Sequence, residues 1–186
     1  MTLQVARRRF TTAEYARMAE AGVLGEDDRL ELIEGEIIEL APIGYGDAAC
    51  VRRMTSLFSR LLGEGVQVSV QNPIDLDENT QPQPDLVLLR PRDDFYSTAH
   101  PTAADILLLV EVAETSGDYD RQIKVPLYAQ RGIDEVWLVD LRQRRLIVYR
   151  DPAADSYRTA QIFQSSEALS SSAFPDKLIA VADVLG

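Results

Sequence analysis

Apolar residues recur along much of the chain with the period of an amphipathic helix. Over residues 47–62, the side chains of Val51, Met54 and Phe58 fall on one helical face. A second helix is predicted over residues 120–131, after the longest apolar stretch of the chain. Both segments therefore predict helices that pack one face against the rest of the molecule.

Two signals near the start of the chain are local rather than periodic. Thr11 followed by Glu14 has the spacing of a capping box, which predicts that a helix begins there. Residues 30–40 predict two short strands joined at Glu34 and Gly35, because hairpin turns need residues that tolerate a positive φ. The N-terminal region is thus expected to be a helix followed by a hairpin.

Further segments predict strands, since they are short, apolar and rich in β-branched residues. One of them, residues 106–112, is apolar on both faces, which is typical of a strand in the middle of a covered sheet. The order of the elements predicts an α/β or α+β fold, a mixed β-sheet flanked by helices. These strands are expected at residues 66–70, 86–89, 106–112, 135–139 and 146–149.

The length of the chain sets its expected domain organisation. With 186 residues and no long linker, the sequence predicts one domain over residues 1–186. Its core is expected over about residues 11–150, followed by a C-terminal strand and tail over 151–186. No apolar stretch approaches the roughly 20 residues that cross a bilayer, and no signal peptide is recognisable, so we expect a cytoplasmic protein without a membrane span.

Cysteine, histidine and charge exclude several classes of function. Cys50 and His100 are the only residues of their kinds, which excludes internal disulfides, cysteine zinc sites and most histidine-based catalysis. Acidic residues outnumber basic ones 30 to 19, and the net charge of −11 repels nucleic acid from the chain as a whole. Enzymatic chemistry therefore has to rest on carboxylates and lysine, and nonspecific affinity for DNA is expected to be weak.

Glu111 is the charged residue inside the apolar strand 106–112. A carboxylate buried there is costly unless it is paired, protonated or bound to a cation. Asp85 opens the neighbouring apolar run, so the two carboxylates are expected to converge at one sheet edge, where oxygen ligands suit Mg²⁺ or Mn²⁺. In the structural alternative, Glu111 pairs with Arg121 and Asp85 caps a turn.

Lys124 follows Asp120 by four residues in the next helix, so both side chains share one helical face. If that face looks toward the strand ends, the ammonium completes a site for metal-assisted hydrolysis of a phosphodiester. Alternatively, Lys124 and Asp120 form a solvated surface pair. Glu31 reaches the same pocket from the hairpin, or is an exposed strand residue.

Five short motifs occur in a fixed order over about residues 11–150. They are Glu31-Leu32-Ile33-Glu34-Gly35, Gln83-Pro84-Asp85, Val110-Glu111-Val112, the helix with Asp120, Lys124 and Tyr128, and the run from Gly132 to Asp140. As an ordered set they resemble the PD-(D/E)XK nuclease superfamily, and more closely its bacterial restriction-endonuclease-like family of the Uma-two type.

This resemblance implies a restriction-endonuclease-like fold and a metal-dependent active site. Asp85 and Glu111 are the metal ligands that it implies, with the carbonyl of Val112 as a third ligand and Mg²⁺ or Mn²⁺ as the ion. Lys124 is the catalytic lysine that it implies. Many nucleases of this superfamily act as dimers, so we also expect a homodimer.

The chain departs from the family pattern at two positions. Ala113 stands where the superfamily usually has its lysine, two residues after the glutamate, so Lys124 has to reach the same point from the helix. Asp47 stands where the family often has a histidine, and this places a negative charge near the substrate. Among the matched residues, Glu31, Asp120 and Tyr128 are expected to support the site.

Three hypotheses of function follow from these residues. The leading hypothesis is a Mg²⁺-dependent endonuclease that hydrolyses phosphodiester bonds in DNA. The second is a binding or regulatory protein that keeps the nuclease fold without cleaving, for which the net charge and Asp47 are the motivating features. The third is an interaction protein whose acidic face meets a basic protein partner.

Overall fold

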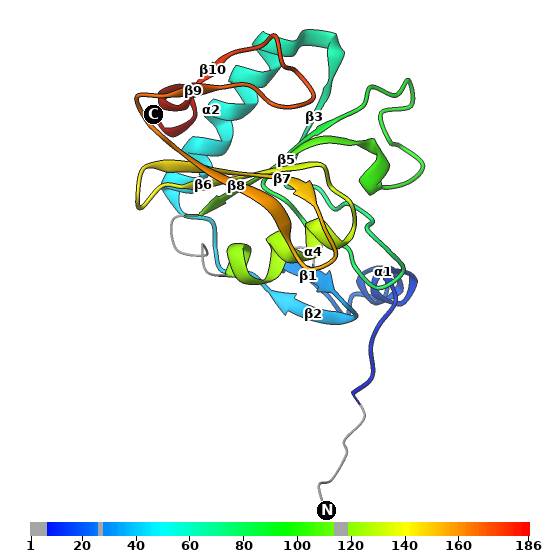
Figure 1. Cartoon of the computed structure of the whole chain (residues 1–186). Helices are drawn as coiled ribbons and strands as arrows, with labels where there is room; N and C mark the ends of the chain where they lie inside the picture. Colours follow the sequence, from blue (N-terminus) through cyan, green and yellow to red (C-terminus); the bar gives the residue numbers. More distant parts are fainter. Residues whose placement is uncertain (1–6, 26–27, 114–118) are drawn as a thin grey trace, which may run out of the picture.

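A six-stranded sheet forms the centre of the computed structural model, which describes residues 7–25, 28–113 and 119–186. The strand order is β3-β4-β5-β6-β7-β8, and of these neighbours β5 and β6 run parallel while the other pairs are antiparallel. Helices cover both faces of the sheet, and a separate hairpin lies below it (Figure 1). The expected mixed sheet flanked by helices is therefore confirmed.

No helix in the described part of the chain is long and apolar enough to cross a membrane.

The elements follow the predicted order along the chain. The helices are α1 (Thr12–Glu20), α2 (Tyr45–Leu62), the 3-10 turns η1 (Gly63–Gly65) and η2 (Ala103–Asp105), the π-helix η3 (Asp120–Lys124), α4 (Val125–Gln130) and α5 (Val181–Leu185). The strands are β1 (Leu30–Ile33), β2 (Glu36–Glu39), β3 (Gln67–Val70), β4 (Leu86–Leu89), β5 (Ile106–Ala113), β6 (Glu135–Asp140), β7 (Arg145–Pro152), β8 (Tyr157–Gln164), β9 (Ala168–Leu169) and β10 (Ile179–Ala180).

Both local signals near the start of the chain are confirmed. The backbone N–H of Glu14 donates to Oγ1 of Thr11 at 3.2 Å, and the Thr11 N–H donates back to the Glu14 carboxylate at 3.1 Å. In the β1–β2 turn, Glu34 and Gly35 have φ of 48° and 79°. A Cβ on Gly35 would lie 2.5 Å from Cβ of Arg9, so the packing as well as the backbone requires glycine here.

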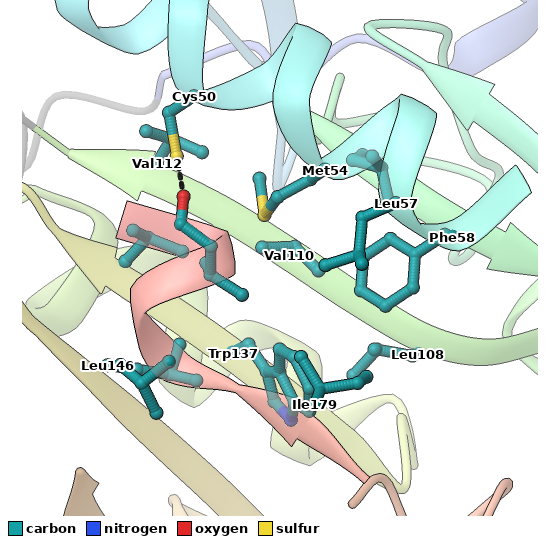
Figure 2. Close-up of a cluster of buried hydrophobic side chains, with 14 of the residues drawn as sticks. Cys50, Met54, Leu57, Phe58, Leu108, Val110, Val112, Trp137, Leu146 and Ile179 are labelled. Carbon is teal, nitrogen blue, oxygen red and sulfur yellow. Dashed lines mark hydrogen bonds between the residues drawn. The ribbon is translucent and has the colours of Figure 1, made fainter. Parts of the chain in front are cut away.

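The face of the sheet under α2 carries the larger of the two hydrophobic clusters. Figure 2 shows Met54 and Phe58 of α2 directed toward β5 and toward Trp137 of β6. The C-terminal α5 joins this cluster, and the carbonyl of Val184 accepts a hydrogen bond of 3.3 Å from the Cys50 thiol. The C-terminal segment therefore contributes a helix to the core, where the sequence had indicated only a strand and tail.

The opposite face of the sheet is covered by α4 and carries the second cluster. Leu109 of β5 and Tyr128 of α4 are both fully buried in it. Since β5 is buried on both faces, its prediction as a central strand is confirmed. Its alternation also fixes which residues reach α4, because successive strand residues point to opposite faces.

The predicted helix over residues 120–131 is confirmed, but its first turn has π rather than α geometry. Residues Asp120–Lys124 form a π-helix, in which the backbone N–H of Val125 donates to the carbonyl of Asp120, five residues earlier. Pro126 then lies within the first two residues of α4, where a missing N–H is tolerated. Lys124 consequently stands at the junction of two helical geometries.

Two leucines provide a test of this core. Leu108 is fully buried and Leu178 is 71% exposed. We expect Leu108→Ala to lower the free energy of unfolding by about 2 to 5 kcal/mol through lost burial and a cavity. Leu178→Ala, the matched control, should change it by less than about 0.5 kcal/mol. Urea titration followed by the fluorescence of Trp137, the single tryptophan, measures both; equal effects would contradict the assigned core.

Candidate functional site

The candidate site lies at the sheet edge where β4 begins and β5 ends. These strands are antiparallel, and Leu86 pairs with Val110, so Asp85 and Glu111 are the next residues at this edge. Glu111 shares its face of β5 with Leu109, the face that α4 covers. The two acids are thus brought to one place by the pairing of two apolar strands.

The side chain of Asp85 forms hydrogen bonds just beyond the last paired residues of β4 and β5. Its Oδ2 accepts a hydrogen bond of 2.9 Å from the backbone N–H of Val112, and its Oδ1 accepts one of 3.1 Å from Nε2 of Gln71. The backbone N–H of Asp85 donates to Oε2 of Glu111 at 3.4 Å. Asp85 and Glu111 therefore lie side by side, rather than on opposite sides of the molecule.

Lys124 is buried between two glutamates. Its Nζ lies 2.8 Å from Oε1 of Glu31 and 3.1 Å from Oε1 of Glu111, and the side chain is only 4% exposed. The alternatives of a solvated pair between Lys124 and Asp120 and of an exposed Glu31 are both wrong. The structure instead joins the hairpin, β5 and the π-helix through one ammonium group.

The hairpin is fixed to the segment that leads into Asp85. Leu32 and Gln81 exchange backbone hydrogen bonds of 3.3 and 2.7 Å, and the N–H of Gln83 donates to Oε1 of Glu31 at 2.8 Å. The other Glu31 oxygen, Oε2, is buried and has no hydrogen-bond partner among the described residues. The carboxylate of Glu31 is therefore held at the base of the site with capacity to accept a further donor.

Glu111 has a further donor besides Lys124 and the backbone N–H of Asp85. The hydroxyl of Tyr128 donates to Oε1 of Glu111 at 2.6 Å, and both residues are buried. Arg121, the alternative partner of Glu111, lies 3.8 Å from Asp140 instead. The interpretation of Glu111 as the partner of Arg121 is thus wrong, and its carboxylate is held by an ammonium and a phenol.

A small cavity of about 80 Å³ opens onto these side chains. Its charged lining is mostly acidic. Asp120 is 4% exposed and belongs to this lining, as does Asp47, whose Oδ2 also accepts the N–H of Gly44 at 3.3 Å. The lining charges are those of Arg29, Asp47, Asp85, Glu111, Asp120 and Lys124.

Burial and mutual charge shift the pKa values of the buried groups. Burial raises the pKa of Glu111 to about 8, because loss of hydration outweighs the opposing charge of Lys124. For Lys124, burial acts to lower the pKa, but the charges of Glu111, Glu31 and Asp120 together raise it above its usual value. Burial, followed by the charge of Glu111, raises the pKa of Tyr128 well above its usual value. Lys124 and Tyr128 are thus held as protonated donors, and burial makes the charged form of Glu111 costlier than it is in water.

Sequence reasoning missed two residues at this site. Gln71 donates to Asp85 and follows β3, whose Val70 pairs with Leu86. Pairing the predicted strands 66–70 and 86–89 in antiparallel register would have placed Gln71 opposite Asp85. Arg29 lines the cavity and donates to a backbone carbonyl of the segment after β2, and no pattern in the sequence indicates it.

Within residues 7–25, 28–113 and 119–186, no three carboxylate, imidazole or thiol side chains are arranged to hold a metal ion. Fewer than three such side chains among these residues could therefore bind one metal ion together. The adjacent carboxylates are those of Asp85 and Glu111, and a backbone carbonyl would have to supplement them.

Comparison with known proteins finds a solved structure with the same fold and a family whose profile matches the chain. A crystal structure described as "a putative nuclease belonging to DUF820 from Anabaena variabilis ATCC 29413" has the same fold, with a TM-score of 0.74. It is 14% identical in sequence, and the match covers 95% of this chain and 97% of that chain. A family profile described as "Uma2: Putative restriction endonuclease" matches residues 12–182, and the chain belongs to this family. Among curated proteins, none matches the chain.

The raised pKa of Glu111 gives stability a specific pH dependence. Between its usual value of 4.5 and about 8, the folded chain holds a proton there that the unfolded chain loses. Its contribution to stability is therefore present at low pH and lost as the pH rises through about 8. In metal-free buffer, we expect the free energy of unfolding of the wild type to fall between pH 7 and pH 9 by about 1 kcal/mol more than that of Glu111→Gln.

Urea titrations at several pH values measure this difference. The control is Glu39→Gln, which removes an exposed carboxyl of β2 and should keep the pH dependence of the wild type. Parallel pH profiles for the wild type and Glu111→Gln would contradict the raised pKa.

Proposed function

We propose that the chain is a divalent-metal-dependent endonuclease that hydrolyses phosphodiester bonds in DNA. The observation that carries this proposal is the meeting of Asp85, Glu111 and Lys124, which come from three separate segments, at one small cavity. Membership of a restriction endonuclease family supports nuclease chemistry. The proposed cofactor is Mg²⁺ or Mn²⁺, because both ions take carboxylate and carbonyl oxygens.

The donor set at the cavity suits such an ion. Four carboxylates and two cationic side chains line the cavity, and Glu31 adds a fifth carboxylate beside Lys124, so negative charge is in excess. Asp85 and Glu111 would supply carboxylate oxygens. Val112 would add its carbonyl, because its N–H points to Asp85 and the N–H and C=O of a strand residue lie on the same strand edge. Such a set leaves positions for the waters that Mg²⁺ retains.

The buried lysine is proposed to act as a fixed positive charge. The metal, when bound, lowers the pKa of a coordinated water and neutralises charge that develops on the phosphate. Lys124 stays protonated because Glu111 and Glu31 raise its pKa, so it would donate to the phosphate or to the attacking water rather than accept a proton. Glu31 positions the ammonium, and Tyr128 positions the carboxylate of Glu111.

The position of the lysine in the chain supports the relocation expected for this family. Ala113, where the superfamily usually has its lysine, is buried on the same face of β5 as Glu111. Lys124 brings its ammonium to 3.1 Å from the Glu111 carboxylate from the following π-helix. The charge is thus supplied beside Glu111 although it comes from another element.

We further propose that the protein is a cytoplasmic homodimer. The dimer rests on the resemblance to dimeric nucleases of the superfamily, and the cytoplasmic location on the DNA that a nuclease of this family would act on. Both stay predictions. Light scattering in solution measures the oligomeric state, and fractionation of the source cells measures the location.

A non-cleaving protein with the same fold is the second candidate function. Asp47 lines the cavity at the position where the family often has a histidine, and the net charge of −11 opposes the approach of a polyanion. A third candidate, a partner of basic proteins that binds no metal, rests on the same acidic charge. Metal binding and metal-dependent cleavage together separate the three.

Metal binding is the first measurement. We expect calorimetric titration to detect binding of Mg²⁺ or Mn²⁺, and Glu111→Gln to weaken it at least about tenfold, which is about 1.4 kcal/mol. The control Glu39→Gln should bind like the wild type, since this carboxyl is exposed on β2. No binding by the wild type would support the third candidate and contradict the first two.

DNA cleavage is the second measurement. We expect the wild type to cleave DNA with Mg²⁺ or Mn²⁺ and not with EDTA, and Lys124→Ala to lose about 10²-fold to 10³-fold in rate, as when a transition-state donor is removed. Lys177→Ala, which changes an exposed lysine, is the matched control. Equal cleavage by wild type and Lys124→Ala would exclude the assigned role, whereas metal binding without cleavage would favour the second candidate.

A further inference from the structure

The sheet edge that carries Glu111 also carries an arginine-rich turn. β6 ends at Asp140 and β7 begins at Arg145, and residues 141–144 form the turn between them. Arg142 and Arg144 lie in this turn, and both are exposed. Three arginines thus occur within four positions just after the end of β6, the strand that pairs with β5.

The strand register gives the distance from this turn to the site. Glu111 pairs with Leu138 of β6, which pairs with Ile147 of β7, and Asp140 pairs with Arg145. Neighbouring strands lie about 4.8 Å apart and each residue rises about 3.3 Å, so Cα of Arg145 lies about 12 Å from Cα of Glu111. On a DNA duplex, with about 3.4 Å per base pair, this distance spans three to four base pairs.

Positive charge at this edge exceeds its local compensation. Arg145 lies 3.1 Å and Arg121 3.8 Å from the same carboxylate oxygen of Asp140, so one acid serves two guanidinium groups. Among the described residues, Arg142 and Arg144 form no ion pair. The turn therefore presents two guanidinium groups with which no described acidic side chain is paired.

Helix α2 adds further arginines next to this turn. Arg53 donates to the carbonyl of Leu185 at 2.9 Å, and Arg144 donates to the carbonyl of Gly186 at 2.8 Å. The two guanidinium groups thus meet on consecutive residues of the C-terminal segment, which Figure 1 shows on the same side of the molecule as the β6–β7 turn. Arg52, the neighbour of Arg53 on α2, is exposed.

The other basic cluster of the chain differs from this one in its pairing. Arg7 and Arg9 lie 3.8 and 3.9 Å from Glu36, and Arg8 lies 2.6 Å from Glu14. Acidic neighbours thus offset these arginines. The surface around the β6–β7 turn is therefore the better candidate for binding an anion.

We infer that this basic surface binds the phosphate backbone of a DNA duplex on one side of the bond to be cut. The inference rests on the proposed function and adds where the substrate lies. A chain with a net charge of −11 needs such a local surface to hold a polyanion beside an acidic cavity, and the planar guanidinium group matches a phosphate in two hydrogen bonds. The basic surface consists of Arg52, Arg53, Arg121, Arg142, Arg144 and Arg145.

Salt-dependent binding tests this inference. The probe is a fluorescein-labelled 20-base-pair duplex of mixed sequence, followed by anisotropy over a range of KCl concentrations, in EDTA and again with Ca²⁺, with gels to verify that the duplex stays intact. We expect Arg142→Gln combined with Arg144→Gln to weaken binding about tenfold at about 0.1 M salt, and to reduce the slope of log Kd against log[KCl] by about 1 to 2, since each lost phosphate contact removes about 0.9.

The matched control is Arg90→Gln combined with Arg158→Gln. It removes the same charge from exposed arginines at the opposite end of the sheet and should leave the slope unchanged. The single variant Arg142→Gln, whose side chain is exposed, covers the case in which the loss of Arg144 disturbs the C-terminal segment, and it should lower the slope by about 1.

Each result decides the inference. Equal weakening in the control pair, an unchanged slope in Arg142→Gln, or no binding of the duplex by the wild type at low salt would overturn it. The outcome is separable from that of the proposed function. If binding depends on Arg142 but no DNA is cleaved, only the hydrolase proposal is contradicted. If DNA is cleaved but Arg142→Gln leaves the salt slope of binding unchanged, only the proposed basic surface is contradicted.

Discussion

One ammonium group, shared by two buried carboxylates, fixes the arrangement of the molecule around its site. Lys124 lies on the π-helix, Glu31 on the hairpin and Glu111 on the central strand, and the three meet within 3.1 Å of one nitrogen. Charges are stable in a protein interior only when partners replace their lost hydration, and removing one partner of such a set costs about 3 to 5 kcal/mol. Beside its backbone hydrogen bonds with Gln81, the hairpin is therefore tied to the sheet through a lysine that also lines the cavity. Stability and site geometry depend on the same atoms.

Charge is arranged in two zones around that contact. Close to Lys124, carboxylates outnumber cationic groups. This excess lowers the free energy of unfolding at high pH and favours the binding of a cation. Farther out, at the end of β6 and on α2, arginines are in excess. A polyanion that meets an acidic protein would be repelled by its average charge but attracted by this outer zone. The apolar cluster under α2 packs against the other face of β5, where Figure 2 shows Leu108, Val110 and Val112.

Most of the fold could be predicted because its elements have strong local or periodic sequence patterns. Contacts between distant segments could not be predicted. The two-faced apolar run of β5 gave its central place, and its neighbour β4 then brought Asp85 beside Glu111. The pairing of Glu31 with Lys124 depends on where the hairpin docks, and backbone hydrogen bonds to Gln81, which leave no trace in sequence, decide that. The π-helix has no periodic signal of its own, and α5 has only five residues, too few for a pattern.

The burial of Lys124 has a practical consequence for handling the protein. The chain contains two lysines, and the other, Lys177, is exposed. Reagents that acylate primary amines need an accessible, uncharged nitrogen, and Lys124 offers neither, since it is 4% exposed and its neighbours favour its protonated form. Dyes, beads or sensor surfaces with amine-reactive groups will therefore attach at Lys177 or at the α-amino group. The protein can be labelled or immobilised by ordinary lysine coupling without derivatising its own catalytic candidate.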